Sequence, residues 1–189
     1  MKFGIGKVAA KEDAHHHTSL TKPCDAELNI FLQYLERAAR AVNEPRILIL
    51  GCSPELREIA ARFKARTTVV ANDLEVIERT ADLMKTKNKK EEWLEGDIMV
   101  LPLQKKSFDL IFSDHVLSNV SPFNRENFYG RMNEILKKEG SVVIRSVVFK
   151  KTAKIFESKL SRYFRIIDKK FGKEGIFSEY FPIYFMKPK

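Results

Sequence analysis

Small and polar residues stand where three apolar runs of this chain end. They are Gly51–Ser53, Asp73 and Ser113–His115. An unbroken apolar run is typical of a strand that is buried on both faces of a parallel sheet. The carboxyl ends of parallel strands meet at one edge, and an open α/β sheet binds its ligand there. These three groups are therefore the candidate site residues.

Residues 47–63 have the pattern of a strand, a sharp turn and a helix. Gly51 ends the apolar run, and Ser53 and Pro54 are typical of an N-cap and a first helical residue. Such a turn presents backbone N–H groups and a helix N-terminus at the edge of the sheet. Many α/β domains begin in this way without binding a nucleotide, so the turn alone leaves both interpretations open.

Asp73 lies 22 residues beyond Gly51, after the β-branched run at 67–71. At a separation of about 20 residues, the second strand of a dinucleotide-type fold presents an acidic residue to ribose hydroxyls. A carboxylate suits this task because it accepts hydrogen bonds from both hydroxyls at once. Asp73 also has the position of an N-cap for the helix that follows, and the two roles are compatible.

The rest of the chain alternates between expected helices and strands, which predicts an α/β fold with a doubly wound, mostly parallel sheet of about seven strands. Helices are expected at 23–42 and at 152–160. A further helix is expected between them, with Phe128, Met132, Ile135 and Leu136 on its buried face and Gly140 as its C′ residue. Strands are expected at 47–50, 67–71, 92–95, 110–112 and 141–149, then in YFRIIDKK and YFPIYFMK. A short loop between the last two strands requires an antiparallel final strand.

The chain is basic mainly towards its C-terminal end. Its net charge is +9, and residues 141–189 hold 12 Lys or Arg against 4 Asp or Glu. A basic surface attracts anionic partners such as nucleic acid or a phosphorylated metabolite. No aromatic-rich RNA-binding motif accompanies this charge, and the same residues suit the solvated face of a helix.

Histidines and cysteines give weaker signals. Three adjacent histidines, His15–His17, cannot all point the same way in a helix or strand, so we expect a solvated arm and no metal site. Cys24 and Cys52 have no CxxC spacing and are expected to be reduced thiols.

The apolar runs are shorter than the roughly 18–20 residues of a membrane span, and no signal-peptide pattern is present, so we expect a cytoplasmic protein.

Four segments in order resemble the class I S-adenosylmethionine-dependent methyltransferases. They are ILILGCSP, VVANDLE, EGDIMVLPLQKKSFDLIFSDHVL and FYGRMNEILKKEGSVVI, within residues 45–187. The third is the most specific, because GD, LP and SFD recur at this spacing in that family. The likeness is closest to the small type related to quinone-biosynthesis C-methyltransferases. It implies a Rossmann-like sheet with helices on both faces, S-adenosylmethionine as the cofactor and methyl transfer as the activity.

The resemblance also implies roles for the candidate residues. The cofactor-binding residues would be Gly51, Cys52, Ser53, Asp73, Leu74, Asp97, Ile98 and Ser113. Asp73 would bind the ribose hydroxyls, and Asp97 would accept from the adenine amino group. Asp114 and His115 would lie beside the sulfonium and the methyl acceptor. His115 is a candidate base, because an imidazole of near-neutral pKa can accept a proton, although a histidine after a strand is more often a helix-start or packing residue.

Two positions depart from the usual pattern of that family. An acidic residue usually stands two positions before the first glycine and a second glycine two positions after it, whereas this chain has Ile49 and Ser53. The acid is a usual partner of the cofactor's ammonium group, and Glu55 or Asp114 could replace it. These departures motivate an alternative function as a non-catalytic binding or regulatory subunit. A nicotinamide-dependent enzyme is disfavoured, because GCSPEL lacks the remaining glycines of GxGxxG.

The expected partner is a small-molecule methyl acceptor. The alternative is an RNA acceptor, which the protein would bind through its basic C-terminal region. Residues 1–44 would form an arm and a helix over the cleft, and residues 45–189 the cofactor-binding domain, in a monomer or a homodimer. The acceptor pocket would come from that arm, the region after Asp114 and the 171–179 loop. Arg145 and Lys173 could meet an anionic acceptor.

Overall fold

The computed structural model describes residues 22–149, 151–171 and 182–189. Its strands are β1 (Arg46–Leu50), β2 (Arg66–Ala71), β3 (Glu91–Glu95), β4 (Phe108–Asp114), β5 (Leu136–Arg145), β6 (Phe164–Lys170) and β7 (Ile183–Pro188). Its helices are α2 (Asp25–Ala41), α3 (Pro54–Arg62), α4 (Leu74–Asp82), α5 (Arg125–Ile135) and α6 (Ala153–Tyr163), with a short 3₁₀ helix, η1 (Val116–Ser118).

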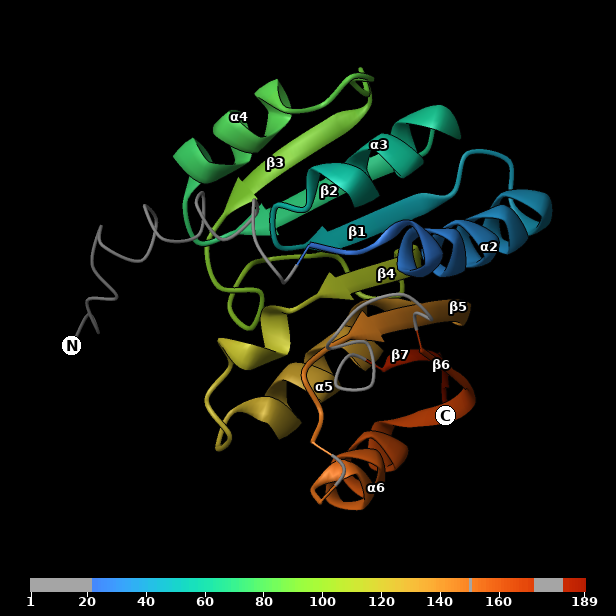
Figure 1. Cartoon of the computed structure of the whole chain (residues 1–189), viewed down its shortest axis with the longest axis vertical. Coiled ribbons are helices and arrows are strands. Elements are labelled where there is room, and N and C mark those ends of the chain that lie inside the picture. Colours follow the sequence, from blue (N-terminus) through green and yellow to red (C-terminus); the bar gives the residue numbers. More distant parts are fainter. Residues whose placement is uncertain (1–21, 150, 172–181) are drawn as a thin grey trace.

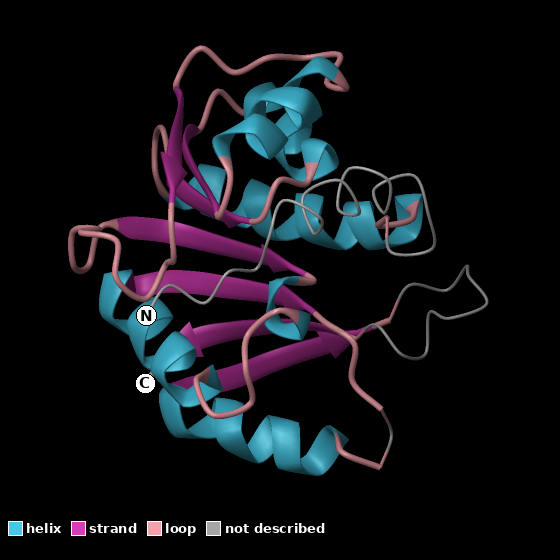
Figure 2. Cartoon of the chain, turned by 90° about the vertical axis from the view of Figure 1, so that its left-hand side faces the viewer, coloured by secondary structure: helices cyan, strands magenta, loops and turns pink. Residues whose placement is uncertain are grey.

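The seven strands form one sheet in the order β3-β2-β1-β4-β5-β7-β6, with helices on both faces (Figures 1 and 2). Neighbouring strands from β3 to β5 pair in parallel, and β7 pairs antiparallel with both β5 and β6. The structure therefore confirms the predicted doubly wound sheet with a reversed last strand.

The central strands are covered on both faces. Side chains alternate between the two faces of a strand, so Ile47 and Ile49 pack with α2, α3 and α4, whereas Leu48 and Leu50 pack with α5 and α6. All four side chains are at most 2% exposed. The continuous apolar run in β1 is therefore explained by burial of both faces of the strand, as predicted.

Parallel pairing brings the turns after β1, β2 and β4 to one edge of the sheet, hereafter the carboxyl edge. Leu50 pairs with Val70 on one side and with Ser113 on the other, so these strands end at nearly the same level. In Figure 1 the arrowheads of β1 and β4 point towards this edge, on the left of the view. The candidate residues that follow these strands are therefore neighbours in space.

The prediction for Gly140 is wrong. Helix α5 ends at Ile135, and Leu136 already has extended backbone and begins β5, so Gly140 lies inside this strand. A Cβ at Gly140 would lie 2.8 Å from Leu136 Cδ1, so the absence of a side chain allows this part of the strand to pack closely on Leu136. Strand β5 accordingly begins five residues before the predicted strand and ends at Arg145.

Helix α2 meets the sheet with a face that includes one charged side chain. The buried residues of the helix are Glu27, Ile30, Phe31, Tyr34 and Leu35. Val42, where the predicted helix ends, follows the end of the observed helix and is 36% exposed. The face of α2 that meets the sheet therefore carries a carboxylate.

Candidate active site

Gly51 forms the turn between β1 and α3 at the carboxyl edge. Its φ is +89°, in the left-handed region that favours glycine, and its N–H donates to the carbonyl oxygen of Val70 at 2.9 Å. A Cβ here would lie 3.3 Å from Val116 Cγ2 and 3.7 Å from the carbonyl oxygen of Asp114. The turn therefore lies directly against the segment that follows β4, and glycine keeps the space between them open.

The residues after Gly51 are buried, and their polar groups are already paired. Cys52 is 8% exposed and Ser53 is 3% exposed. Ser53 occupies the predicted N-cap position of α3, but its hydroxyl donates to Glu55 Oε2 at 3.2 Å and makes no cap hydrogen bond. Glu55 Oε1 also pairs with Lys22 Nζ at 3.1 Å, so the negative charge of Glu55 has a counter-charge within the chain.

Asp73 is the N-cap of α4, as predicted. Its Oδ1 accepts from the N–H of Glu75 at 2.8 Å. A carboxylate has about four acceptor positions, so one cap hydrogen bond leaves room for a ligand hydroxyl. Leu74, the next residue, is 37% exposed. The geometry is therefore compatible with both roles that the sequence suggested for Asp73.

Asp97 lies at the end of β3, one strand further along the edge. Gly96 closes the strand with its N–H donating to the carbonyl oxygen of Ala71 at 2.8 Å. Asp97 Oδ1 then accepts from the N–H of Met99 at 2.9 Å, which fixes the local turn. Asp97 is exposed, and Ile98 is buried beneath it with 7% exposure.

Asp114 ends β4 and belongs to a buried ionic cluster that sequence analysis missed. Arg145 donates from Nη1 to Asp114 Oδ1 at 2.9 Å, and its Nη2 lies 3.0 Å from Glu27 Oε2. The side chains of Glu27, Arg145 and Asp114 are 4%, 2% and 6% exposed. These three residues are hereafter the carboxyl-edge cluster. The prediction that Arg145 meets an anionic acceptor is wrong, because two carboxylates of the chain hold its guanidinium.

One sequence signal for the cluster existed. Glu27 precedes Ile30 and Phe31 by three and four residues, which places it on the buried face of α2. A carboxylate on a buried face must find a partner, because burial of an unpaired charge is costly. The spacing could therefore have predicted a buried cation near α2, although not which one.

His115 follows Asp114 in a strained backbone conformation. Its φ is +62°, which is uncommon for a residue other than glycine and is often found at functional sites. The imidazole Nδ1 lies 3.0 Å from Ser118 Oγ, and the backbone N–H donates to the carbonyl oxygen of Arg145 at 2.9 Å. Burial lowers the pKa of His115, against the opposing effect of Asp114, so the ring is neutral near pH 7.

Burial also acts on the acidic and hydroxyl groups at the end of β4. It raises the pKa of Asp114, although Arg145 opposes the shift. Ser113 is fully buried, and its hydroxyl oxygen has no hydrogen-bond partner among the residues that the structure describes. Polar side chains in such surroundings are typical of ligand sites.

Some predictions concern residues outside the described part of the chain, namely those for His15–His17 and Lys173. Within residues 22–149, 151–171 and 182–189, no group of three or more His, Cys, Asp or Glu side chains is arranged to hold a metal ion. None of the helices in these ranges has both the length and the apolar character needed to cross a membrane.

Comparison with known proteins identifies a family model and similar folds. The model described as a methyltransferase domain matches residues 48–144. No curated protein matches the sequence. The family match confirms the resemblance to the S-adenosylmethionine-dependent methyltransferases, and with it S-adenosylmethionine as the cofactor. The closer likeness to the quinone-biosynthesis type stays a prediction.

Solved structures share the whole fold at low sequence identity. The N-methyltransferase NodS from Bradyrhizobium japonicum, in complex with S-adenosyl-L-homocysteine, has a TM-score of 0.72 and 16% identity, over 95% of this chain and 98% of its own. An S-adenosylmethionine-dependent methyltransferase from Clostridium acetobutylicum has a TM-score of 0.70 and 13% identity, over 96% and 99%. A TehB-like methyltransferase from Corynebacterium glutamicum has a TM-score of 0.69 and 16% identity, over 97% and 100%.

Proposed function

Because the chain belongs to the methyltransferase domain family, we propose that it transfers the methyl group of S-adenosylmethionine to a small-molecule acceptor at the carboxyl edge. The observation that carries this proposal is the row of Gly51, Asp73 and Asp97 at the ends of the adjacent strands β1, β2 and β3. Adjacent strands lie about 4.8 Å apart, so the row spans about 10 Å, the scale of a nucleoside with its substituent. In this row, Gly51 would lie beside the methionine part of the cofactor, Asp73 beside the ribose and Asp97 beside the adenine.

The residues present fit such a cofactor. Gly51 leaves open the space that a Cβ would fill against Val116, which permits close approach of a ligand to the turn. Asp73 keeps acceptor capacity beyond its cap hydrogen bond, and Asp97 is an exposed carboxylate above the buried Ile98. When bound, S-adenosylmethionine supplies a methyl group on a positively charged sulfur. The task of the chain is to hold an acceptor in line with that group.

His115 is the proposed proton acceptor. A base for a hydroxyl or amine acceptor must be neutral before the reaction, and burial keeps the imidazole so near pH 7. The contact between Nδ1 and Ser118 Oγ restrains the orientation of the ring. Ser118 is therefore a positioning residue of the proposed site that the sequence did not indicate.

One feature supports a small molecule rather than RNA as the acceptor. Part of the basic C-terminal charge is neutralised locally, because Arg162 pairs with Glu126 at 3.0 Å and Lys169 with Glu157 at 2.6 Å. This pairing lowers the positive charge that could neutralise a phosphate backbone.

Calorimetric titration with S-adenosyl-L-homocysteine tests the cofactor site. We expect micromolar binding by the wild type, no binding of NAD, and at least about tenfold weaker binding by Asp73→Ala and Asp73→Asn, because a hydrogen bond to a charged group is lost. Asparagine is as good an N-cap as aspartate, so Asp73→Asn should keep α4 intact and separate ligand binding from helix stability. A wild type that fails to bind the nucleoside product contradicts the proposal.

A further inference from the structure

The side chain of Arg131 in α5 holds the segment that connects β3 to β4. This segment, residues 96–107, contains neither a helix nor a strand. Three of its backbone carbonyl oxygens accept from the guanidinium: Leu101 at 2.6 Å and Leu103 at 3.3 Å from Nη2, and Ile98 at 3.4 Å from Nε. Because a segment without regular structure takes its shape from such contacts, Arg131 fixes its position against α5.

Arg131 is itself held in place. Its side chain is 15% exposed, and its Nη1 pairs with Glu134 on the same helix. Glu134 also pairs with Lys105 Nζ at 2.7 Å, and its backbone carbonyl oxygen accepts from the N–H of Lys106 at 3.1 Å. A guanidinium is planar and directs its donors rigidly, so an arginine held in this way can bind several carbonyl oxygens in one fixed arrangement.

The segment that Arg131 holds begins with Asp97, which is proposed to lie beside the adenine. Asp97 is exposed, and its backbone carbonyl oxygen accepts from the N–H groups of Val100 and Leu101, both at 3.0 Å. Asp97 therefore belongs to the same turn as Ile98 and Leu101, whose carbonyl oxygens bind Arg131. The position of the Asp97 carboxylate depends on this turn, and the position of the turn depends on Arg131.

We infer that Arg131 is a positioning residue that sets the preference of the site for adenine. Adenine carries a 6-amino group, a donor that the carboxylate of Asp97 can accept. A hydrogen bond weakens steeply when its distance or angle departs from the optimum, so release of the turn would lose this recognition. Arg131 acts through the turn and not by contact with the cofactor. This inference rests on the proposed function.

Arg125 provides a matched control on the same helix. It donates from Nε to the carbonyl oxygen of Val120 and from Nη2 to that of Leu117, both at 3.3 Å, in the segment after β4. Arg125 and Arg131 are six residues apart, which places them about 120° apart around a helix of 3.6 residues per turn. Replacement of Arg125 therefore removes similar hydrogen bonds and leaves those that hold the Asp97 turn.

Calorimetric titration with two ligands measures the preference for adenine. One is S-adenosyl-L-homocysteine, and the other is its purine analogue, in which hydrogen replaces the 6-amino group. The ratio of the two dissociation constants reports recognition of this amino group, and it does not move when a variant weakens both ligands equally. The variants are Arg131→Met, Arg131→Lys, Asp97→Ala and the double variant Arg131→Met with Asp97→Ala, with Arg125→Met as the control.

We expect the wild type to bind S-adenosyl-L-homocysteine about tenfold more tightly than the analogue, because the analogue lacks a hydrogen bond to a charged group. Arg131→Met and Asp97→Ala should each lower this ratio to about twofold, and the double variant should lower it no further, since both residues act through one contact. Arg131→Lys should give an intermediate ratio, because lysine can pair with Glu134 but lacks the rigid fork of donors. Arg125→Met should keep the ratio of the wild type.

Folding of the variants is checked by near-ultraviolet circular dichroism before titration. A folded Arg131→Met that weakens both ligands equally, or neither, overturns the inference, as does a wild type without preference for the amino group. An equal fall of the ratio in Arg125→Met overturns it as well. If Arg131→Met does not fold, Arg131→Lys decides the question, and an unchanged ratio overturns the inference. Absence of binding of both ligands by the wild type would overturn the proposed function together with it.

Discussion

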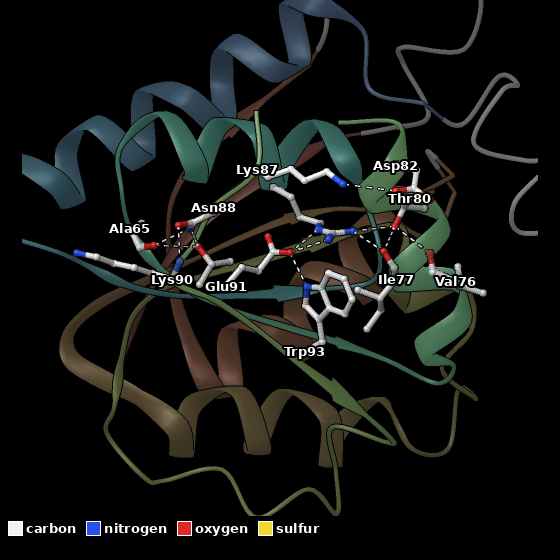
Figure 3. Close-up of polar contacts among 12 residues, drawn as sticks. Ala65, Val76, Ile77, Thr80, Asp82, Lys87, Asn88, Lys90, Glu91 and Trp93 are labelled. Atoms are coloured by element: carbon white, nitrogen blue, oxygen red, sulfur yellow. Dashed lines mark hydrogen bonds and ion pairs between the residues drawn. The ribbon is translucent and has the colours of Figure 1, made fainter. Parts of the chain in front are cut away.

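Two arginines of this protein are buried almost completely, and their surroundings differ. Arg57 in α3 is 0% exposed and Arg145 in β5 is 1% exposed. Arg57 donates from Nε and Nη2 to Glu91 Oε1 at 3.0 and 2.6 Å, and from Nη1 to the carbonyl oxygen of Ile77 and to Thr80 Oγ1. Figure 3 shows Glu91, Ile77 and Thr80 converging from β3 and α4. Arg57 thus joins three elements through one carboxylate and two neutral acceptors.

The charges of the two clusters explain the difference in their roles. Arg57 and Glu91 form a neutral pair, to which Trp93 adds an indole N–H that donates to Glu91 Oε1 at 2.6 Å. Arg145 instead lies between two carboxylates, which leaves negative charge beside the glycine turn. Among the described residues, the Arg57 cluster pairs one arginine with one carboxylate, whereas the carboxyl-edge cluster pairs one arginine with two.

The space beside the Arg57 cluster supports this distinction. A pocket of about 120 Å³ lies there, lined by Arg57, Ala81, Met84, Lys87, Asn88, Glu91 and Trp93. At about 120 Å³, this pocket is well below the roughly 300–1,000 Å³ that is typical of small-molecule sites. It lies near Glu91, the first residue of β3, and therefore away from the strand ends that carry the candidate site.

The largest effect should come from Arg145→Met. The variant leaves both Glu27 and Asp114 buried without their counter-charge, so we expect a loss of about 5 kcal/mol in the free energy of unfolding at pH 7. The folded variant should bind protons on these carboxylates at a higher pH than the unfolded chain does. The loss should therefore shrink as the pH is lowered towards 5, in urea unfolding followed by circular dichroism. A loss that is constant from pH 8 to pH 5 would contradict this account.

A smaller effect is expected for Arg57→Met. One carboxylate, Glu91, loses its counter-charge but keeps the hydrogen bond from Trp93, so we expect a loss of about 3 kcal/mol in urea unfolding. The folded protein should bind S-adenosyl-L-homocysteine within about twofold of the wild type, because the Arg57 cluster lies away from the carboxyl edge. A tenfold loss of affinity in protein shown to be folded would remove the distinction between the clusters.

The smallest effect should be seen with His115→Gln, in the pH dependence of stability. Burial lowers the pKa of His115, so the folded state binds fewer protons than the unfolded state, and stability falls as the pH drops below about 6.5. The variant should lack this contribution and lose less stability between pH 7 and pH 5.5. Asp114, whose pKa is raised by burial, acts in the opposite direction in both proteins. Parallel pH profiles would show that His115 is not held neutral.

Much of the fold was predictable because its signals are local. The apolar run of β1, the glycine turn and Pro54 determine a strand, a turn and a helix over neighbouring residues, and the structure shows them as expected. The error at Gly140 has a tertiary cause, since this glycine is required by close packing on Leu136 and not by a helix end. A glycine after a helical pattern does not by itself distinguish these two causes.

The identity of the residues that pair in the ionic cluster could not be predicted, for a different reason. Arg145 and Asp114 are 31 residues apart, and Glu27 lies on a helix that precedes the whole sheet. Only the pairing of β4 with β5 and the packing of α2 on that face bring them together. In contrast, Asp73 was identified correctly as an N-cap, because its partner, the N–H of Glu75, is two residues away.

The position of β7 has a consequence for synthesis of the protein. β7 lies between β5 and β6 in the sheet but follows both in the sequence, and 37 residues separate Arg145 from Ile183. While a ribosome makes those residues, one side of β5 has no strand to pair with, and β6 has no place in the sheet. An unpaired strand edge can join the edge of another chain. Until Ile183–Pro188 leaves the ribosome, the nascent protein therefore presents an unpaired edge of β5 that can associate with another chain.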